Sequence, residues 1–92
     1  MDLLSEEDRQ AFLFGHEGWT IEGEVLSKTF VHDSFAAAVG FVAAVGVLAE
    51  KAFHHPDIDI RYSKVTISLT THDGGGLTAN DTELATQIEA LR

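Results

Sequence analysis

The sequence contains no cysteine and few basic residues. The lack of cysteine excludes a disulfide scaffold, a thiolate metal site and a thiol nucleophile. Six lysines and arginines stand against 15 aspartates and glutamates, so the formal net charge is −9. Such a surface repels nucleic-acid phosphates and anionic lipids, so we expect neither nucleic acid nor a membrane as a partner. What this short acidic chain does contain is five histidines, and these need an explanation.

The length of 92 residues predicts a single domain, residues 1–92. A chain of this size buries only about 60–65% of the surface of its unfolded form, so oligomerisation is expected to add stability. The acidic start, Met1–Glu7, has none of the regions of a signal peptide. The longest uncharged run, Ser34–Ala49, has 16 residues, whereas a membrane span needs about 20. We therefore expect a cytoplasmic protein.

Apolar periodicity and capping residues predict three helices and four strands in the order α-β-β-α-β-β-α. The predicted elements are a helix from Ser5 to Gly15, a hairpin over 19–31 turning at Gly23 and Glu24, a helix from Asp33 or Ser34 to about Phe53, a hairpin over 58–69 turning at Ser63 and Lys64, and a helix that follows Thr78. Thr78 and Asp81 have the spacing of a capping box. Two hairpins without strand-helix-strand alternation indicate an α+β fold, with a four-stranded antiparallel sheet and three helices on one face.

The predicted helix over 34–53 is apolar on nearly every side. Such a helix must be buried on more than one side, and a domain this small offers it only one sheet face. We therefore expect a second subunit to cover the other side, with Gly40, Ala44 and Gly46 allowing close approach. The alternative is that these small residues simply tolerate solvent.

Three of the histidines bracket one predicted hairpin. His54 and His55 precede its first strand, next to Pro56, and His72 follows its second strand. Because the start of the first strand lies beside the end of the second, the three imidazoles are expected to meet at one edge of the sheet. Histidine is the side chain best suited to proton transfer near neutral pH. The alternative is three unrelated surface histidines.

Other residues near this point allow two interpretations each. Glu50, one helical turn before His54, could orient an imidazole or be a solvated carboxylate at a helix end. Asp81 could cap its helix and also lie near the site, and capping is favoured as its main role. Trp19 could stack on a flat heterocycle or fill the core. No metal site is expected, because the side chains of adjacent histidines diverge in an extended chain and no metal-binding histidine motif is present.

Three motifs extend the histidine pattern along the chain. They are Glu50-Lys51-x-x-His54-His55-Pro56, Tyr62-x-x-Val65-x-Ile67-x-Leu69-x-Thr71-His72, and Gly75-Gly76-Leu77-Thr78-x-x-Asp81. A lone His-His-Pro sequence would be weak evidence, but the three motifs at this spacing are specific. With them the chain resembles the pterin-4a-carbinolamine dehydratases over almost its whole length.

The resemblance implies a hydro-lyase that removes water from a 4a-hydroxytetrahydropterin, the adduct left by aromatic amino-acid hydroxylases. The product would be quinonoid dihydropterin, returned for recycling without a cofactor or a metal. The resemblance implies His54 and His72 as an acid-base pair and His55 as the residue that binds and orients the pterin. The supporting and substrate-binding residues that it implies are Trp19, Glu50, Pro56 and Asp81.

The resemblance also implies a homodimer or homotetramer, assembled through the helix over 34–53 and the sheet edge. This agrees with the second subunit expected from the apolar helix. The implied partners are a small-molecule pterin and, as a functional link, an aromatic amino-acid hydroxylase. The alternative, from another class of protein, is a non-catalytic assembly module that keeps the fold and binds a partner with its long helix.

Overall fold

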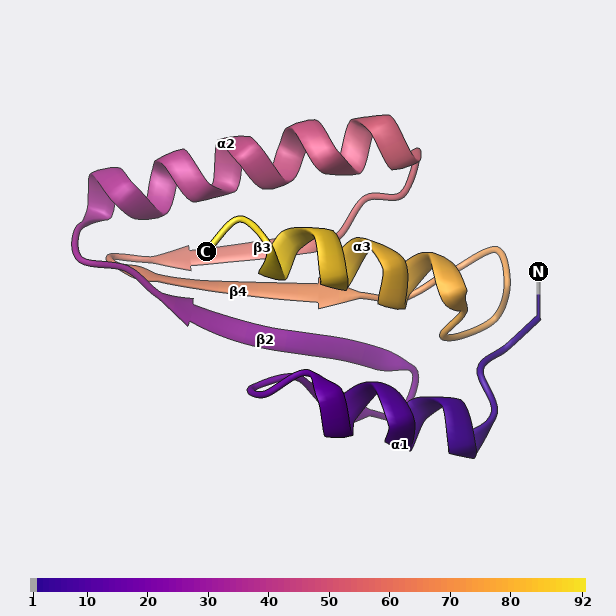
Figure 1. The fold of residues 1–92 in the computed structure, drawn as a ribbon. Helices are drawn as coiled ribbons and strands as arrows, with labels where there is room; N and C mark the ends of the chain where they lie inside the picture. Colours follow the sequence, from indigo (N-terminus) through magenta and orange to yellow (C-terminus); the bar gives the residue numbers. More distant parts are fainter. Residues whose placement is uncertain (1) are drawn as a thin grey trace.

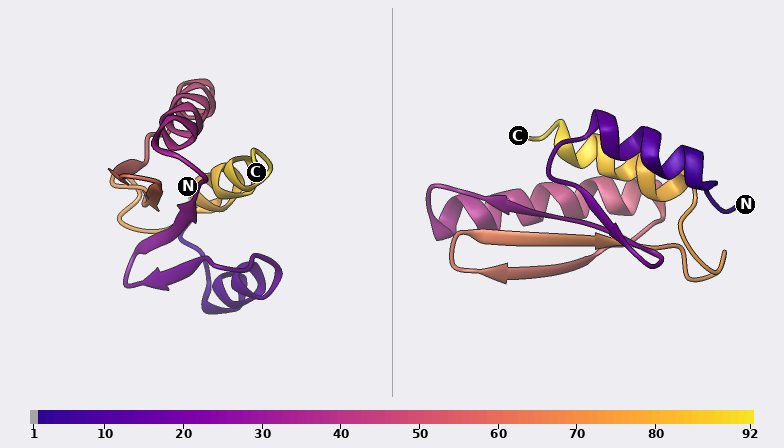
Figure 2. Two further views of the ribbon diagram at one scale, coloured as in Figure 1. Left: turned by 90° about the vertical axis from the view of Figure 1, so that its left-hand side faces the viewer. Right: turned by 90° about the horizontal axis from the view of Figure 1, so that it is seen from below.

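The computed structural model describes residues 2–92, which form three helices and one four-stranded antiparallel sheet (Figure 1). In chain order the elements are α1 (Glu6–Gly15), β1 (Thr20–Glu22), β2 (Val25–Val31), α2 (Phe35–Ala52), β3 (Asp57–Arg61), β4 (Lys64–Leu69) and α3 (Ala79–Glu89). Figure 2 shows the three helices on one side of the sheet. The element order, the α+β class and the one-sided placement of the helices are therefore confirmed.

Within the sheet the strands follow the order β1-β2-β4-β3, and every neighbouring pair is antiparallel. Alternate residues face the helices, because successive side chains of a strand point to opposite faces. The strand side chains that are fully buried are Leu26, Phe30, Val65, Ile67 and Leu69. Since β3 has a partner on one side only, it is an edge strand, and its Ile58 and Ile60 stay partly exposed.

The hairpin of β3 and β4 turns one residue earlier than the sequence predicts. Arg61 pairs with Lys64, so the two-residue turn is formed by Tyr62 and Ser63. Tyr62 has a φ of 54°, which is unusual for a bulky residue. The alternation of apolar residues through Ile60 and Tyr62 does not reveal this conformation. The predicted turn at Ser63 and Lys64 was wrong by one position.

The helix starts predicted from capping residues are confirmed. The Ser5 side chain accepts from the N–H of Asp8 and the Asp8 carboxylate accepts from the N–H of Ser5, which completes a capping box at α1. Ser34 caps α2, and Thr78 and Asp81 form the capping box of α3. These caps satisfy backbone N–H groups that have no partner inside the helix.

The helix α2 is buried along one stripe only, formed by Ala38, Phe41, Val45 and Ala49. Away from this stripe the exposed fraction reaches 62% at Val47. With 18 residues and a mean hydropathy of 1.7, α2 is long and apolar enough by these two measures to cross a membrane. The core helix of a soluble protein passes the same test, and α2 packs against α3, β3 and β4. Part of α2 is thus core, and the rest is an uncovered apolar face.

The end of α2 is built around a phenylalanine in a left-handed conformation. Phe53 has a φ of 51° and a ψ of 39°. Its N–H donates to the carbonyl of Glu50 at 3.2 Å, and the N–H of His54 donates to the carbonyl of Ala49 at 3.1 Å. This is the Schellman pattern, in which glycine is the usual left-handed residue. The Phe53 side chain is 89% exposed, so its burial does not offset the cost of the conformation.

We expect Phe53→Gly to raise the free energy of unfolding by about 1 kcal/mol, because the left-handed conformation costs roughly that much for a residue with a Cβ. Chemical denaturation followed by circular dichroism measures the difference. Phe53→Ala is the matched control, because it removes the same exposed ring but keeps the Cβ. Equal stability of the two variants would contradict this explanation.

Candidate active site

The hairpin of β3 and β4 carries the three predicted site histidines at one end of the sheet. Asp57, the first residue of β3, pairs with Ser68 near the end of β4. His54 and His55 shortly precede β3 and His72 shortly follows β4, so the backbone of all three lies at this end. The predicted proximity of the two strand ends is confirmed, whereas the convergence of the three imidazoles stays a prediction.

His54 is held by a carboxylate from α3. Its Nε2 lies 2.5 Å from Oδ1 of Asp81, and only 12% of the His54 side chain is exposed, while the Asp81 side chain is fully buried. An ionised carboxylate at this distance accepts a hydrogen bond from Nε2, which leaves Nδ1 to exchange a proton. The contact fixes the orientation of the imidazole.

The second oxygen of Asp81 is also engaged. Oδ2 accepts hydrogen bonds from the N–H of Thr78 at 2.9 Å and from Oγ1 of Thr71 at 2.8 Å. The hydroxyl oxygens of Thr71 and Thr78 are themselves 2.9 Å apart. Asp81 therefore caps α3, as predicted, and also joins His54 to the residue immediately before His72.

The two adjacent histidines have different partners, as expected in an extended chain. Whereas His54 contacts Asp81, Nε2 of His55 lies 2.6 Å from Oε1 of Glu50. The side chains of this second pair are 63% and 78% exposed. Pro56 follows and restricts His55 to extended conformations. Within residues 2–92, no group of three or more histidine, aspartate or glutamate side chains is arranged to hold a metal ion.

His72 lies on a closed loop between β4 and α3, and we call residues 71–77 the His72 loop. Thr71 and Gly76 form an isolated antiparallel bridge, in which the N–H of Gly76 donates to the carbonyl of Thr71 at 3.1 Å. The N–H of Gly75 donates to the carbonyl of His72, also at 3.1 Å. His72 itself is exposed, so the conformation of this loop determines where its imidazole stands.

Trp19 is placed away from the three predicted site histidines. It is 4% exposed, meets Phe12 and Phe30 edge to face, and donates from Nε1 to Glu89 at 2.9 Å. Glu89 ends α3, whereas Asp81 lies in the first turn of that helix. These contacts are those of a core residue, one of the two interpretations of the sequence. A pterin-binding wall formed by Trp19 stays a prediction.

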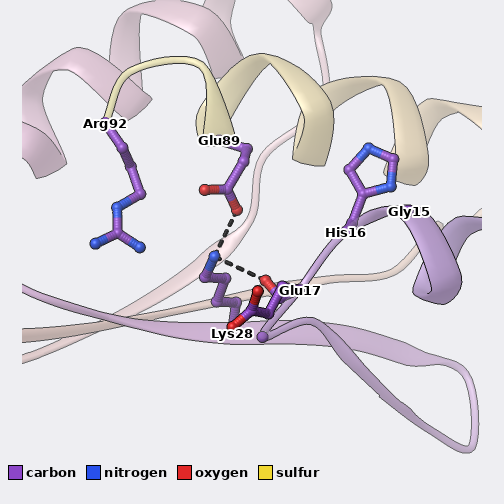
Figure 3. A pocket seen from close by; sticks show the side chains of 7 residues that line it. Gly15, His16, Glu17, Lys28, Glu89 and Arg92 are labelled. Carbon is purple, nitrogen blue, oxygen red and sulfur yellow. Dashed lines mark hydrogen bonds and ion pairs between the residues drawn. The ribbon is translucent and has the colours of Figure 1, made fainter.

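A cavity of about 510 Å³ also lies at this far end of α3 (Figure 3). Lys28 reaches into it and donates to Glu89 at 2.6 Å and to the carbonyl of Glu17 at 2.9 Å. Burial raises the pKa of Glu89, but the hydrogen bonds from Lys28 and Trp19 outweigh burial and hold this pKa below its ordinary value. Because the two central charges are already paired, we assign this cavity no ligand.

The two remaining histidines lie apart from the candidate site. His16 stacks on Phe12 with ring centroids 3.9 Å apart, and its Nδ1 lies 2.8 Å from the carbonyl of Phe12. His32 packs on Phe41 at the opposite end of the sheet. Its Nε2 is buried with no hydrogen-bond partner in the described part of the chain. Both residues are partly buried.

Three supporting interactions were missed from the sequence. The Thr71 hydroxyl reaches Asp81, and only its place in the second motif, next to His72, indicated a role. Glu24 accepts a hydrogen bond from the N–H of Leu77 at 2.9 Å, across a separation of 53 residues. Arg9 pairs with the same carboxylate at 2.7 Å. No local pattern points to contacts between segments so far apart.

Comparison with known proteins relates the whole chain to one family. The family described as pterin 4 alpha carbinolamine dehydratase matches residues 2–91. A relative from Roseiflexus sp. (strain RS-1), whose name pterin-4-alpha-carbinolamine dehydratase is provisional, is 53% identical over 88 residues, covering 96% of this chain and 95% of the relative. The resemblance carried by the three sequence motifs is thereby confirmed.

Solved structures give the same relationship. The transcriptional coactivator/pterin dehydratase from Brucella melitensis superimposes with a TM-score of 0.92 at 31% identity, covering 97% of each chain. A pterin dehydratase-like protein, described as a RuBisCO assembly factor in the alpha-carboxysome, has a TM-score of 0.71 at 28% identity, covering 83% of this chain and 90% of that one. The fold is thus shared by proteins described in catalytic and in assembly terms.

Proposed function

The chain belongs to the pterin-4a-carbinolamine dehydratase family, and on that premise we propose that it is a hydro-lyase acting on a 4a-hydroxytetrahydropterin. In this reaction the bond between C4a and the hydroxyl oxygen breaks, and the adjacent ring nitrogen loses its proton. The products are quinonoid dihydropterin and water. The step needs an acid at the leaving oxygen and a base at the nitrogen, and groups of this kind contribute about 10²–10⁴-fold each.

The observation that carries the proposal is the contact between His54 and Asp81, linked through Thr71 to His72. In the proposed mechanism His54 and His72 are the acid-base pair. Asp81 holds the His54 imidazole in one orientation, because its buried carboxylate oxygen lies within hydrogen-bond distance of Nε2. His72 acts from the exposed loop on the other side of the network.

The exposed pair of Glu50 and His55 supports a binding role. A pterin carries an amino group and a ring N–H on one edge, and a carboxylate such as that of Glu50 can accept from both. His55 would orient the ring, and Pro56 would keep the His55 backbone extended. Because both side chains of the pair are largely exposed, a ligand can reach them without rearrangement of the core.

The test is the dehydration assay. A hydroxylase generates the 4a-hydroxy adduct, and its decay is followed by ultraviolet absorbance with and without this protein. We expect the decay to be faster than the spontaneous reaction. A decay no faster than the spontaneous one would rule out the proposed activity.

We also propose a homodimer or homotetramer, formed through α2 and the edge strand β3. The outer face of α2, defined by Phe35, Val39 and Val47, is exposed and apolar, and burying it against a second copy would stabilise a chain of this size. The edge strand β3 offers unpaired backbone groups beside it.

Val47→Glu is expected to reduce the molar mass toward that of a single chain, because a charge on this face opposes its burial. Light scattering at micromolar concentration measures the mass. Phe14→Glu is the matched control, since Phe14 is 97% exposed on α1, and it should leave the mass unchanged. A wild-type mass of about 10.0 kDa would show that the chain is a monomer.

The structural neighbour described as a RuBisCO assembly factor favours a second candidate function. On this alternative the chain is a non-catalytic module that binds a partner with the outer face of α2. The dehydration assay separates the two candidates, because the alternative requires no turnover. On the leading proposal the protein acts in the cytoplasm, where it recycles the pterin of an aromatic amino-acid hydroxylase.

A further inference from the structure

Glu24 lies in the turn between β1 and β2, yet its carboxylate reaches the His72 loop. Its Oε1 accepts from the N–H of Leu77 at 2.9 Å. From α1, Arg9 donates through Nη2 to both carboxylate oxygens at 2.7 Å and through Nη1 to the carbonyl of Gly23 at 2.9 Å. The carboxylate is therefore bound to α1 through Arg9 and at the same time holds the end of the loop through Leu77.

The loop backbone also packs directly on this carboxylate. A Cβ placed on Gly76 would lie 2.1 Å from Oε1 of Glu24 and 2.8 Å from its Cδ. Such distances are too short for any side chain, so glycine at this position allows the close approach. Through the contact with Gly76 and the hydrogen bond from Leu77, Glu24 holds two successive residues of the His72 loop. We call these contacts the Glu24 tether.

The Glu24 tether lies at one end of the His72 loop, and the other end of this loop belongs to the candidate site. Thr71 is bridged to Gly76 and donates to Asp81, which in turn contacts His54. His72 stands between the end held by Asp81 and the end held by Glu24. Displacement of either end would move its imidazole relative to His54.

We propose that Glu24 is a positioning residue that sets the place of His72 in the site. The inference rests on the proposed function for its catalytic consequence, while the effect on the loop is independent of it. Glu24 touches no reacting group and acts through Leu77 and Gly76. In catalysis a misplacement of about 1 Å can cost on the order of 10²-fold in rate, so a tether of this kind affects kcat.

The ionised state of the Glu24 carboxylate suits this positioning role. Hydrogen bonds from Arg9, and after it from the N–H of Leu77, hold the pKa of Glu24 below its ordinary value of 4.5. The folded state therefore favours the ionised carboxylate. Its contribution is fully present above pH 4.5 and is lost as the pH falls through the lowered pKa.

The test compares Glu24→Ala with Glu89→Ala in the full chain. Glu89 is a matched control, because it also accepts from a cation and a second donor, Lys28 and Trp19, but at the far end of α3. We expect Glu24→Ala to speed amide hydrogen exchange of Leu77 by about tenfold relative to the control, as for a lost hydrogen bond. We also expect shifted His72 ring resonances in NMR spectra, and a kcat about tenfold lower with KM unchanged.

A third variant tests the mechanism of the effect. Glu24→Gln keeps an oxygen that can accept from Leu77, so it should restore most of the exchange protection and of kcat. If Leu77 exchange in Glu24→Ala matched that in Glu89→Ala, the tether would be disproved. If exchange rose but the His72 resonances and kcat did not change, the positioning role would be disproved. Should the wild-type protein have no dehydratase activity, the exchange and ring measurements would still decide whether Glu24 places the loop.

Discussion

His72→Ala is expected to lower kcat of the dehydration by roughly 10²–10⁴-fold, the range lost with a general acid or base. His72 is exposed on its loop, and its side chain is not part of the Asp81 network. Substitutions at such positions change the free energy of unfolding by about 0.5 kcal/mol or less. Activity and stability should therefore separate at this residue, and rapid kinetics together with chemical denaturation measure both.

Two other histidines provide controls for this result. His55→Ala should raise KM more than it lowers kcat, because His55 is proposed to orient the pterin rather than to transfer a proton. His16→Gln removes the stacking on Phe12 and should lower stability without lowering kcat. If His72→Ala kept the wild-type kcat, the acid-base pair would have to be sought elsewhere.

Those parts of the fold that local sequence determines were predicted correctly. The capping box of Thr78 with Asp81 spans only four residues and forms as expected, and the first helix starts after Ser5 as expected. The four-stranded antiparallel sheet was predicted from two hairpins, while the strand order β1-β2-β4-β3 came only from the structure. Tyr62 marks the limit of this reasoning, because alternation of apolar residues is the same whether the last residue is in the strand or in a left-handed turn.

For the candidate site, the sequence predicted mainly where the backbone of its histidines lies. Pairing of two neighbouring strands brings His54 and His72 to one end, and this needs only the hairpin. The contact of Asp81 with His54 depends on how α3 packs beside the end of α2, which no local pattern encodes, whereas Glu50 and His55 lie only five residues apart in the chain. The hydrogen bond from the N–H of Leu77 to Glu24 likewise depends on tertiary packing.

Asp81→Ala is expected to reduce the free energy of unfolding by about 3–5 kcal/mol, because it removes the buried acceptor of several hydrogen bonds and each donor left without a partner costs about 1–3 kcal/mol. The side chain is fully buried and accepts from His54, from the hydroxyl of Thr71 and from the N–H of Thr78. Alanine leaves all three donors without this acceptor. Because small domains have only about 5–15 kcal/mol in total, the variant should unfold at much lower denaturant concentration.

The chain contains its own control for this prediction. Asp8 occupies the same third position of the capping box in α1, where it is exposed. Asp8→Ala should cost only about 1 kcal/mol or less, since it removes a cap and nothing else. The difference between the two variants measures what Asp81 contributes beyond capping, through His54 and Thr71. If both variants lost the same stability, Asp81 would be a helix cap alone, and the network that supports the proposed acid-base pair would have no energetic basis.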